Sequence, residues 1–465
     1  MSRLRSTRLT RIELTAYAAP ALGYAFATVP VFGVLPTLYA QHARLSVAAI
    51  GTLVLIRSLY DAVSDQVIGF LSDRTRSRLG ARVPWILAGT IVTVFGLYYL
   101  LRIPADAGLG YFAGWTVVFF TGTTMFGIPH TAWGHELTPV YAERNRVFGY
   151  RGFADNAGGA LFSLLPLALV FFGVAADAEY TPEMIWRLGL ITMAGLPILV
   201  LFMAFFAPRS TASATERTTM IGVLRSFKGN RPFLRFILAY VIAGTGYGFF
   251  VALLYPFVAT YLRIPEAFAT ILLVTTLASL ASVPIWVRLT NWLGKHRAWA
   301  WGWLTNSLVL VPMFWVAPGP SAIVPTCVLL TAYALTNGVS SVAPFAILSD
   351  VIDYDILKTK IDRGGNYYAL MMMSVKALGS TGGIALIVLG SVFGYDMTAG
   401  HENTRSADLS MLWMFIAAPA LFQLATLPLI WNFPIDARRH AIIRRRLDDR
   451  AARAATAATA EAIAP

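Results

Sequence analysis

The stretch IGTLVLIRSLYDAVSDQVIGFL, residues 50–71, places two carboxylates, Asp61 and Asp65, inside an otherwise apolar run. A carboxylate at bilayer depth is costly unless it is paired, protonated or bound to an ion, so an acid within a membrane span is a candidate for a transport pathway. Four residues separate the two acids, which on a helix is about 400° of rotation and puts both side chains on one face. Together they can share one cation.

The composition favours an all-α membrane protein. The 465 residues are 57% hydrophobic and only 13% charged, with a mean hydropathy of +0.63, whereas soluble proteins carry roughly 25% charged residues. Hydrophobic stretches long enough to cross a bilayer recur along the whole chain. They predict twelve transmembrane helices, at residues 14–40, 48–71, 84–102, 107–134, 152–174, 185–207, 233–262, 266–288, 298–316, 321–348, 366–394 and 409–432.

The net charge of +13 arises from basic residues at the termini and in every second loop. Examples are the cluster from Arg74 to Arg82 after the second span and the run from Arg438 to Arg453 after the twelfth. This distribution follows the positive-inside rule and predicts that both termini are cytoplasmic. It also makes a nucleic-acid partner unnecessary as an explanation of the charge.

An internal repeat divides the chain. Leu79-Gly80-Ala81-Arg82 follows the second span and Leu293-Gly294-Lys295 follows the eighth, each before a helix led by tryptophan. The spacing, about 214 residues, is that of two parallel six-helix halves. The expected units are an N-terminal six-helix bundle (1–207), a cytoplasmic linker (208–231), a C-terminal six-helix bundle (232–432) and a basic cytoplasmic tail (433–465).

Three segments resemble the glycoside-pentoside-hexuronide:cation symporters of the major facilitator superfamily. The first runs from Asp61 to Trp85 and contains both acids and the basic loop. The second joins the fourth and fifth spans, with Glu136-Leu137-Thr138-Pro139 and Tyr150-Arg151, and the third is Ser349-Asp350-Val351-Ile352-Asp353-Tyr354, followed by Lys376. Together they cover most of the chain.

The resemblance implies the major facilitator fold, two six-helix bundles with substrate and cation sites near the midplane, and coupled secondary transport. It implies that Asp61 and Asp65 bind the coupling cation, and that Arg151 and Lys376 line the central cavity. Three positions depart from the family pattern. Ala25 stands where the family has a sugar-binding acid, Gly127 replaces a third cation-site acid, and Gln66 replaces a proline.

Those departures bear on the ligands. Sodium prefers several oxygen ligands, whereas a proton needs one carboxylate with a raised pKa, so the loss at Gly127 slightly favours H⁺ over Na⁺. Sodium at Asp61 and Asp65 stays an alternative, with backbone carbonyls or Thr121, Thr123 or Thr124 completing the shell. The first span offers tyrosines and threonines for a substrate, Tyr24 among them.

Arg57, Arg151 and Lys376 each have both a structural and a functional interpretation. Arg57 lies four residues before Asp61, so the two can form a purely architectural ion pair. Arg151 and Lys376 can instead extend toward headgroups, although Lys376 lies well inside its span. Asp155 is one turn after Arg151 and is expected to pair with it.

A cytoplasmic gate is expected at the ends of the second, fourth and tenth spans. Gly69 permits close helix approach, and Asp73 can bond an arginine of the next loop, which would hold the two bundles together in one state of the cycle. The positive charge of this cluster would also be explained by a role in setting the membrane topology alone. The candidate gate residues are Gly69, Asp73, Arg74, Arg78, Glu136, Asp350 and Asp353.

The leading hypothesis is a proton- or sodium-coupled symporter that imports a saccharide or glycoside across a bacterial inner membrane, as a monomer in the lipid bilayer. A transporter of an amphipathic substrate such as a lysolipid, and a non-transporting receptor on the same fold, are the alternatives. No nucleophile elbow, phosphate-binding loop or zinc motif predicts an enzyme or a cofactor. The single cysteine, Cys327, excludes an intramolecular disulfide.

Overall fold

The computed structural model describes residues 9–104, 106–138, 141–208, 229–360, 364–398 and 401–463. Nearly all of the expected linker, 208–231, therefore lies outside the described residues. The first half of the chain forms seven helices, which are α1 (Arg11–Gly33), α2 (Leu35–His42), α3 (Val47–Arg74), α4 (Val83–Leu101), α5 (Leu109–Glu136), α6 (Tyr141–Phe171) and α7 (Pro182–Phe206).

The second half is more interrupted, with short 3₁₀ and π segments (η) inside its spans. Its elements are α9 (Arg231–Pro256), η1 (Phe257–Tyr261), η2 (Pro265–Ala267), α10 (Phe268–Leu293), α11 (Lys295–Leu310), η3 (Val311–Trp315), η4 (Pro320–Ala322), α12 (Ile323–Asn337), η5 (Gly338–Ser341), α13 (Ala343–Thr359), α14 (Gly364–Gly379), α15 (Thr381–Ile387), η6 (Val388–Val392), α16 (Arg405–Leu412), η7 (Trp413–Ala417), α17 (Ala418–Ala425), α18 (Leu427–Ile430) and the tail helix α19 (Ala437–Ile463).

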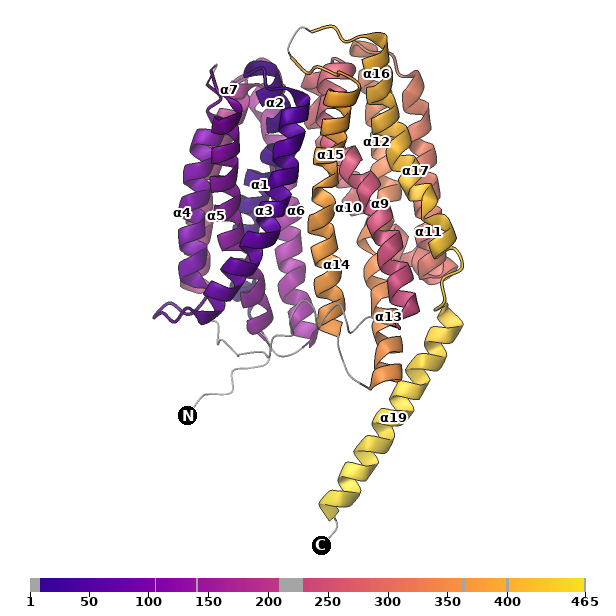
Figure 1. Cartoon of the computed structure of the whole chain (residues 1–465). Coiled ribbons are helices and arrows are strands. Elements are labelled where there is room, and N and C mark those ends of the chain that lie inside the picture. The colour runs from indigo at the N-terminus through magenta and orange to yellow at the C-terminus, as the bar shows by residue number, and fades with distance from the viewer. Residues whose placement is uncertain are drawn as a thin grey trace.

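These elements make the twelve predicted spans and confirm the all-α fold of two six-helix halves (Figure 1). Among the described residues, ten helical segments are long and apolar enough to cross a membrane. The other two spans are α11 continued by η3, and α14 continued through α15 and η6. Most spans begin and end within a few residues of the predicted boundaries. The exceptions are α6, which begins at Tyr141 rather than at 152, and α13, which ends at Thr359 rather than at 348.

Local sequence explains where several spans start. Thr10, Ser46 and Thr181 each accept a hydrogen bond from the backbone three residues later and so cap α1, α3 and α7. Glu13 completes a capping box with Thr10. The two repeat glycines both adopt the left-handed region, Gly80 at φ 94° and Gly294 at φ 85°, which turns the chain between consecutive spans.

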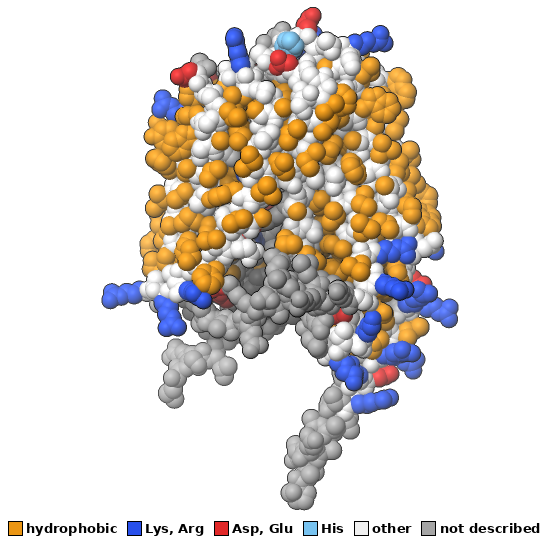
Figure 2. Space-filling model, in the orientation of Figure 1, with side chains coloured by type: hydrophobic (Ala, Val, Ile, Leu, Met, Phe, Trp, Pro, Cys, Tyr) orange, Lys and Arg blue, Asp and Glu red, His pale blue; other side chains and the backbone are white. Residues whose placement is uncertain are grey.

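The outer surface fits a bilayer. On the face shown in Figure 2, hydrophobic side chains form a broad belt and basic side chains gather below it. Several large apolar side chains are exposed, among them Phe153 at 78% and Phe205 at 80%. Such a surface is costly in water and ordinary in lipid. We name the end at which α13 ends and α19 begins the terminal end, and the end that carries α2 and α16 the distal end (Figure 1).

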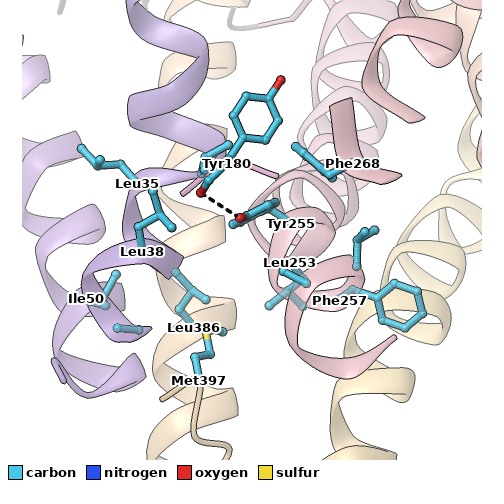
Figure 3. Packing of buried hydrophobic residues seen from close by; sticks show 14 of the residues in the cluster. Leu35, Leu38, Ile50, Tyr180, Leu253, Tyr255, Phe257, Phe268, Leu386 and Met397 are labelled. Carbon is cyan, nitrogen blue, oxygen red and sulfur yellow. Dashed lines mark hydrogen bonds between the residues drawn. The ribbon is translucent and has the colours of Figure 1, made fainter. Parts of the chain in front are cut away.

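The two halves pack against each other at the distal end. One buried hydrophobic cluster contains residues of both halves, including Leu38 and Ile50 from the first and Leu253 and Leu386 from the second (Figure 3). The hydroxyl of Tyr255 also donates to the carbonyl of Tyr180 across the halves, at 3.5 Å. The remaining clusters each belong to one half. The distal end is therefore sealed.

Small residues make this seal possible. A Cβ placed on Gly51 of α3 would lie 2.6 Å from the carbonyl oxygen of Gly383 of α15, and a Cβ on Gly390 would lie 2.6 Å from the backbone nitrogen of Ala48. Both distances are shorter than van der Waals contact, so the backbones approach as closely as glycine allows.

Gly51→Ala is expected to destabilise the distal-sealed state by about 1–3 kcal/mol, because the added methyl overpacks a backbone contact. The measurement is the distance between spin labels at Arg44 and Arg405, both exposed at the distal end, in a Cys327→Ser background. Gly114→Ala is the matched control, since a Cβ there meets no described atom within 4 Å. Identical distance distributions in Gly51→Ala and the control would contradict this account of the seal.

Candidate functional site

The inner face of α3 carries the polar residues of the site. Arg57, Ser64, Ile68 and Ser72 are buried at helical spacing. Asp61 lies in the same stripe with its side chain 20% exposed, and Asp65, one turn later, is half-buried. The structure thus places both acids on one face, as their spacing predicts.

Arg57 is the most enclosed charge of this stripe, at 7% exposure. Its guanidinium lies 4.5 Å from the ring centre of Phe32 and 4.3 Å from that of Phe120, and its Nη1 is 3.8 Å from Oδ2 of Asp61. Two aromatic faces and a carboxylate therefore hold the cation in place. The ion pair that the sequence offered as an architectural alternative is present.

A cavity of about 410 Å³ lies between the halves, and Arg57 is part of its wall. The first half also contributes Phe32, Thr116 and Phe120, and the second contributes Trp299 and Trp303 among others. A volume of this size suits a small organic ligand. Asp61 and Asp65 lie beyond Arg57 along α3 rather than in the cavity wall.

Arg151 begins a polar chain on α6 and α5. Its Nη1 donates to Oγ1 of Thr131 at 2.7 Å, and the Thr131 hydroxyl in turn donates to the carbonyl of Gly127 at 2.7 Å. Asp155 interacts with Arg151 electrostatically, but no ion pair within 4.0 Å joins these two described residues and the Asp155 side chain is exposed. The close partner of the Arg151 guanidinium is the Thr131 hydroxyl.

Tyr24 does not line the cavity. Its ring stacks on Phe126 at 3.6 Å between centroids, and its hydroxyl bonds to Thr90 at 3.1 Å. The stack continues through the fully buried His130 to Tyr17. The predicted substrate role of Tyr24 is therefore replaced by packing inside the first half. Lys376 lies on α14, and its side chain is outside the described set.

At the terminal end of the first half, Arg82 joins three elements. Its Nη1 contacts Asp73 at 2.5 Å and the hydroxyl of Ser72 at 3.0 Å, and its Nη2 contacts Glu136 at 2.6 Å. Asp73 thus bonds a basic residue of the following loop, as the gate hypothesis expects, but the contact lies within one half.

The second half repeats this arrangement. Lys295 contacts Asp350 at 2.6 Å. The interval from Arg82 to Lys295 equals the interval from Glu136 to Asp350 within one residue, so the two ion pairs occupy equivalent places in the repeat. The tail helix adds a second layer, because His440 lies 3.2 Å from Asp350 and 3.0 Å from Asp353. Arg444 approaches Asp353 at 3.4 Å. Each half is therefore tied together by its own partly buried ion pair.

The other gate candidates make looser contacts. Arg74 lies over the ring of Phe70 at 3.8 Å, and Arg78 is exposed. A Cβ on Gly69 would lie 3.6 Å from Ile128, an ordinary contact distance. Close helix approach at Gly69 is thus not required in this state.

Comparison with known proteins identifies the chain. Residues 16–437 match the model of the MFS/sugar transport protein family. The chain belongs to that family. The two halves around a central cavity, with Asp61 and Asp65 on α3, are the features that the sequence predicts for a transporter of this kind.

Relatives cover the chain almost end to end. An uncharacterized symporter of Synechocystis is 26% identical over 94% of this chain and 96% of its own length. The glucuronide carrier protein homolog of Escherichia coli is 23% identical (92% and 93%), and the sodium-dependent lysophosphatidylcholine symporter 1-A of Danio rerio 22% identical (96% and 91%). A bacterial homolog of the lysosomal transporter Spinster, inward-facing and unoccupied, has a TM-score of 0.59 at 14% identity (94% and 96%). These relatives make the chain a multi-pass membrane protein of a cation-coupled symporter family.

Sequence reasoning missed three residues of the site. The sequence identifies Arg82 and Lys295 only as markers of the repeat. Because the two occupy equivalent positions, equivalent partners were to be expected, and these are Glu136 and Asp350. Trp299 was not singled out, because a tryptophan at a span boundary is usually an interfacial anchor. Its position in the cavity wall depends on how the halves face each other.

Arg82→Ala is expected to lower the free energy of unfolding by about 3 kcal/mol, because it withdraws the guanidinium from two partly buried carboxylates. Thermal or chemical unfolding of the purified protein measures the loss. Arg78→Ala is the matched control and should change stability by less than about 0.5 kcal/mol, since the side chain is exposed. Equal stability of both variants would show that the Arg82 cluster does not hold the first half together.

Proposed function

We propose that this protein is a cation-coupled symporter that imports a saccharide or glycoside by alternating access. The observation that carries the proposal is the position of Asp61 and Asp65 on the inner face of α3, one and two turns from the cavity residue Arg57. A carboxylate pair beside a cavity can bind a cation only while the surrounding helices expose it to one side of the membrane. Family membership supports the same activity.

The basic residues favour a cytoplasmic terminal end. With that orientation the distal seal closes the outer side, so the structure is in an inward-facing state. The protein is proposed to act as a monomer in a bacterial inner membrane. This location is consistent with the relative described as an inner membrane symporter of Escherichia coli.

The coupling ion is proposed to be H⁺, with Na⁺ as the alternative at Asp61 and Asp65. Among the described residues no group of three or more His, Cys, Asp or Glu side chains could hold a metal ion. Thr121, a candidate for an extra oxygen ligand, shares a hydrogen bond with the hydroxyl of Tyr60 at 2.6 Å. Two carboxylates without a third acid suit a proton better than a sodium ion.

A second candidate function is transport of an amphipathic lipid. The cavity wall is mainly apolar and aromatic, and one relative is a lysophosphatidylcholine symporter. The receptor alternative is less favoured, because a sensor has no need of a coupling cation. Uptake of radiolabelled saccharides, glycosides and lysolipids into proteoliposomes, with imposed H⁺ or Na⁺ gradients, distinguishes the three. Binding of a solute without any gradient-driven accumulation would support the receptor and contradict symport.

Asp61→Asn and Asp65→Asn should each reduce accumulation against a gradient to the level of empty liposomes, because each removes a charge needed to hold the cation. Folding should be retained, since Asn keeps the shape of the side chain. Asp106→Asn, at an exposed loop position, is the control and should transport normally. Wild-type accumulation in both α3 variants would exclude Asp61 and Asp65 as the coupling site.

Uptake should respond to an imposed pH gradient in the absence of sodium, because the site lacks a third acid. Gly127→Asp is expected to add sodium dependence. A Cβ at Gly127 meets no described atom within 4 Å, so the new side chain has room. A wild-type protein that requires sodium at fixed membrane potential and ignores the pH gradient would make the proton assignment wrong.

A further inference from the structure

Three buried polar atoms of the cavity wall have no hydrogen-bond partner among the described residues. They are Nη1 of Arg57, Oγ1 of Thr116 and Nε1 of Trp299. Arg57 and Thr116 belong to the first half and Trp299 to the second. Guanidinium and indole nitrogens can only donate hydrogen bonds. The cavity wall thus contains hydrogen-bond donors from both halves that have no acceptor among the described residues.

Arg57 is the only one of the three that carries a full charge. It is 93% enclosed by its surroundings, with aromatic rings on two sides and Asp61 at 3.8 Å. That separation is longer than a direct charge-assisted hydrogen bond, which is about 2.7–2.9 Å. The neighbours of the guanidinium therefore fix its position but leave its Nη1 without a hydrogen-bond acceptor.

The rest of the wall is mainly apolar and aromatic, and its other polar side chains are neutral: Thr37, Asn337, Ser340, Ser341 and Gln423. Tyr240, Tyr247 and Trp303 line the second half, and Val31, Ile50 and Leu53 line the first. No carboxylate occurs among the described residues of this wall. Arg57 is thus the one charged side chain among the described residues of this wall. A guanidinium bonds most strongly to an anionic acceptor, which favours an anionic solute over a neutral one.

We propose that the cavity selects an anionic amphipathic solute, whose carboxylate or phosphate binds Arg57 and whose apolar body packs against the aromatic wall. Trp299 contributes to the aromatic wall from the opposite half. The inference rests on the proposed transport function and narrows its substrate class. A uronide with an apolar aglycone and a lysophospholipid share this chemistry.

The pair of Arg57 and Asp61 links this group to the cation site. The solute's anion and the Asp61 carboxylate are both partners for one guanidinium. Removal of the Asp61 charge leaves Arg57 to the solute and should tighten anion binding. Cation and anion would then favour each other's binding, which is the thermodynamic requirement of symport.

The test is ligand-induced thermal stabilisation of the purified full-length protein, which rises with ln(1 + [L]/Kd). Two matched pairs of probes separate charge from shape. They are 4-nitrophenyl β-D-glucuronide against 4-nitrophenyl β-D-glucoside, and oleoyl lysophosphatidate against monooleoylglycerol. In at least one pair the anion should bind about tenfold more tightly than its neutral partner. The pair that shows the preference identifies the source of the anion.

Variants assign the preference to the named atoms. Arg57→Gln should abolish the difference between anion and neutral probe, and Asp61→Asn should increase it, whereas Trp299→Phe, which keeps the aromatic wall and the ion pair, is the matched control and should leave it unchanged. Asp61→Asn keeps Arg57 in place, so it tests the proposal even if Arg57→Gln fails to fold. No preference in either pair of probes, or a preference unchanged in Arg57→Gln or in Asp61→Asn, overturns the proposal.

Failure of this inference is distinguishable from failure of symport, because the binding assay uses no ion gradient. Gradient-driven accumulation of a neutral saccharide without anion preference would overturn the anion site and leave symport intact. Anion preference without gradient-driven accumulation would do the reverse.

Discussion

The cost of placing carboxylates inside an apolar helix is the constraint on which the rest of the structure depends. Asp61 and Asp65 must face the protein interior, which fixes the rotation of α3 about its axis. The opposite face then carries apolar side chains such as Leu59 and Val63, both largely exposed. The same rotation brings Gly51 against the second half and Arg57 into the cavity wall. Seal, cavity and cation site are thus consequences of one helix orientation.

Ion pairs within each half give the molecule two units that can move against each other. Arg82 ties α3, α4 and α5 together, and Lys295 with Asp350 ties α11 to α13 in the second half. Among the described residues, contacts between the halves at the distal end are mainly apolar and rely on close backbone approach, with the hydrogen bond from Tyr255 to Tyr180 as a polar exception. Rigid halves joined by a separable apolar seam suit alternating access, because little polar bonding is lost when the seam opens.

Sequence alone predicted the twelve spans, the two halves and the shared face of Asp61 and Asp65, because each depends on local periodicity and composition. It could not place Tyr24 or Arg151, whose partners lie on other helices. Tyr24 looked like a cavity residue and packs on Phe126, and Arg151 looked paired with Asp155 and bonds Thr131. Tertiary packing decides which helix faces meet in a bundle, and local sequence does not reveal it. The ion pairs of Arg82 and Lys295 differ, because their equivalent positions in the repeat could have predicted them.

The central claim is that the α3 carboxylates bind the coupling cation. Its most direct test is the number of cations that the purified protein binds without substrate, measured by proton uptake in weak buffer and by binding of radioactive sodium. The account predicts that the wild type binds one cation more than a variant in which both Asp61 and Asp65 are changed to Asn. Equal cation binding by the two proteins would contradict it.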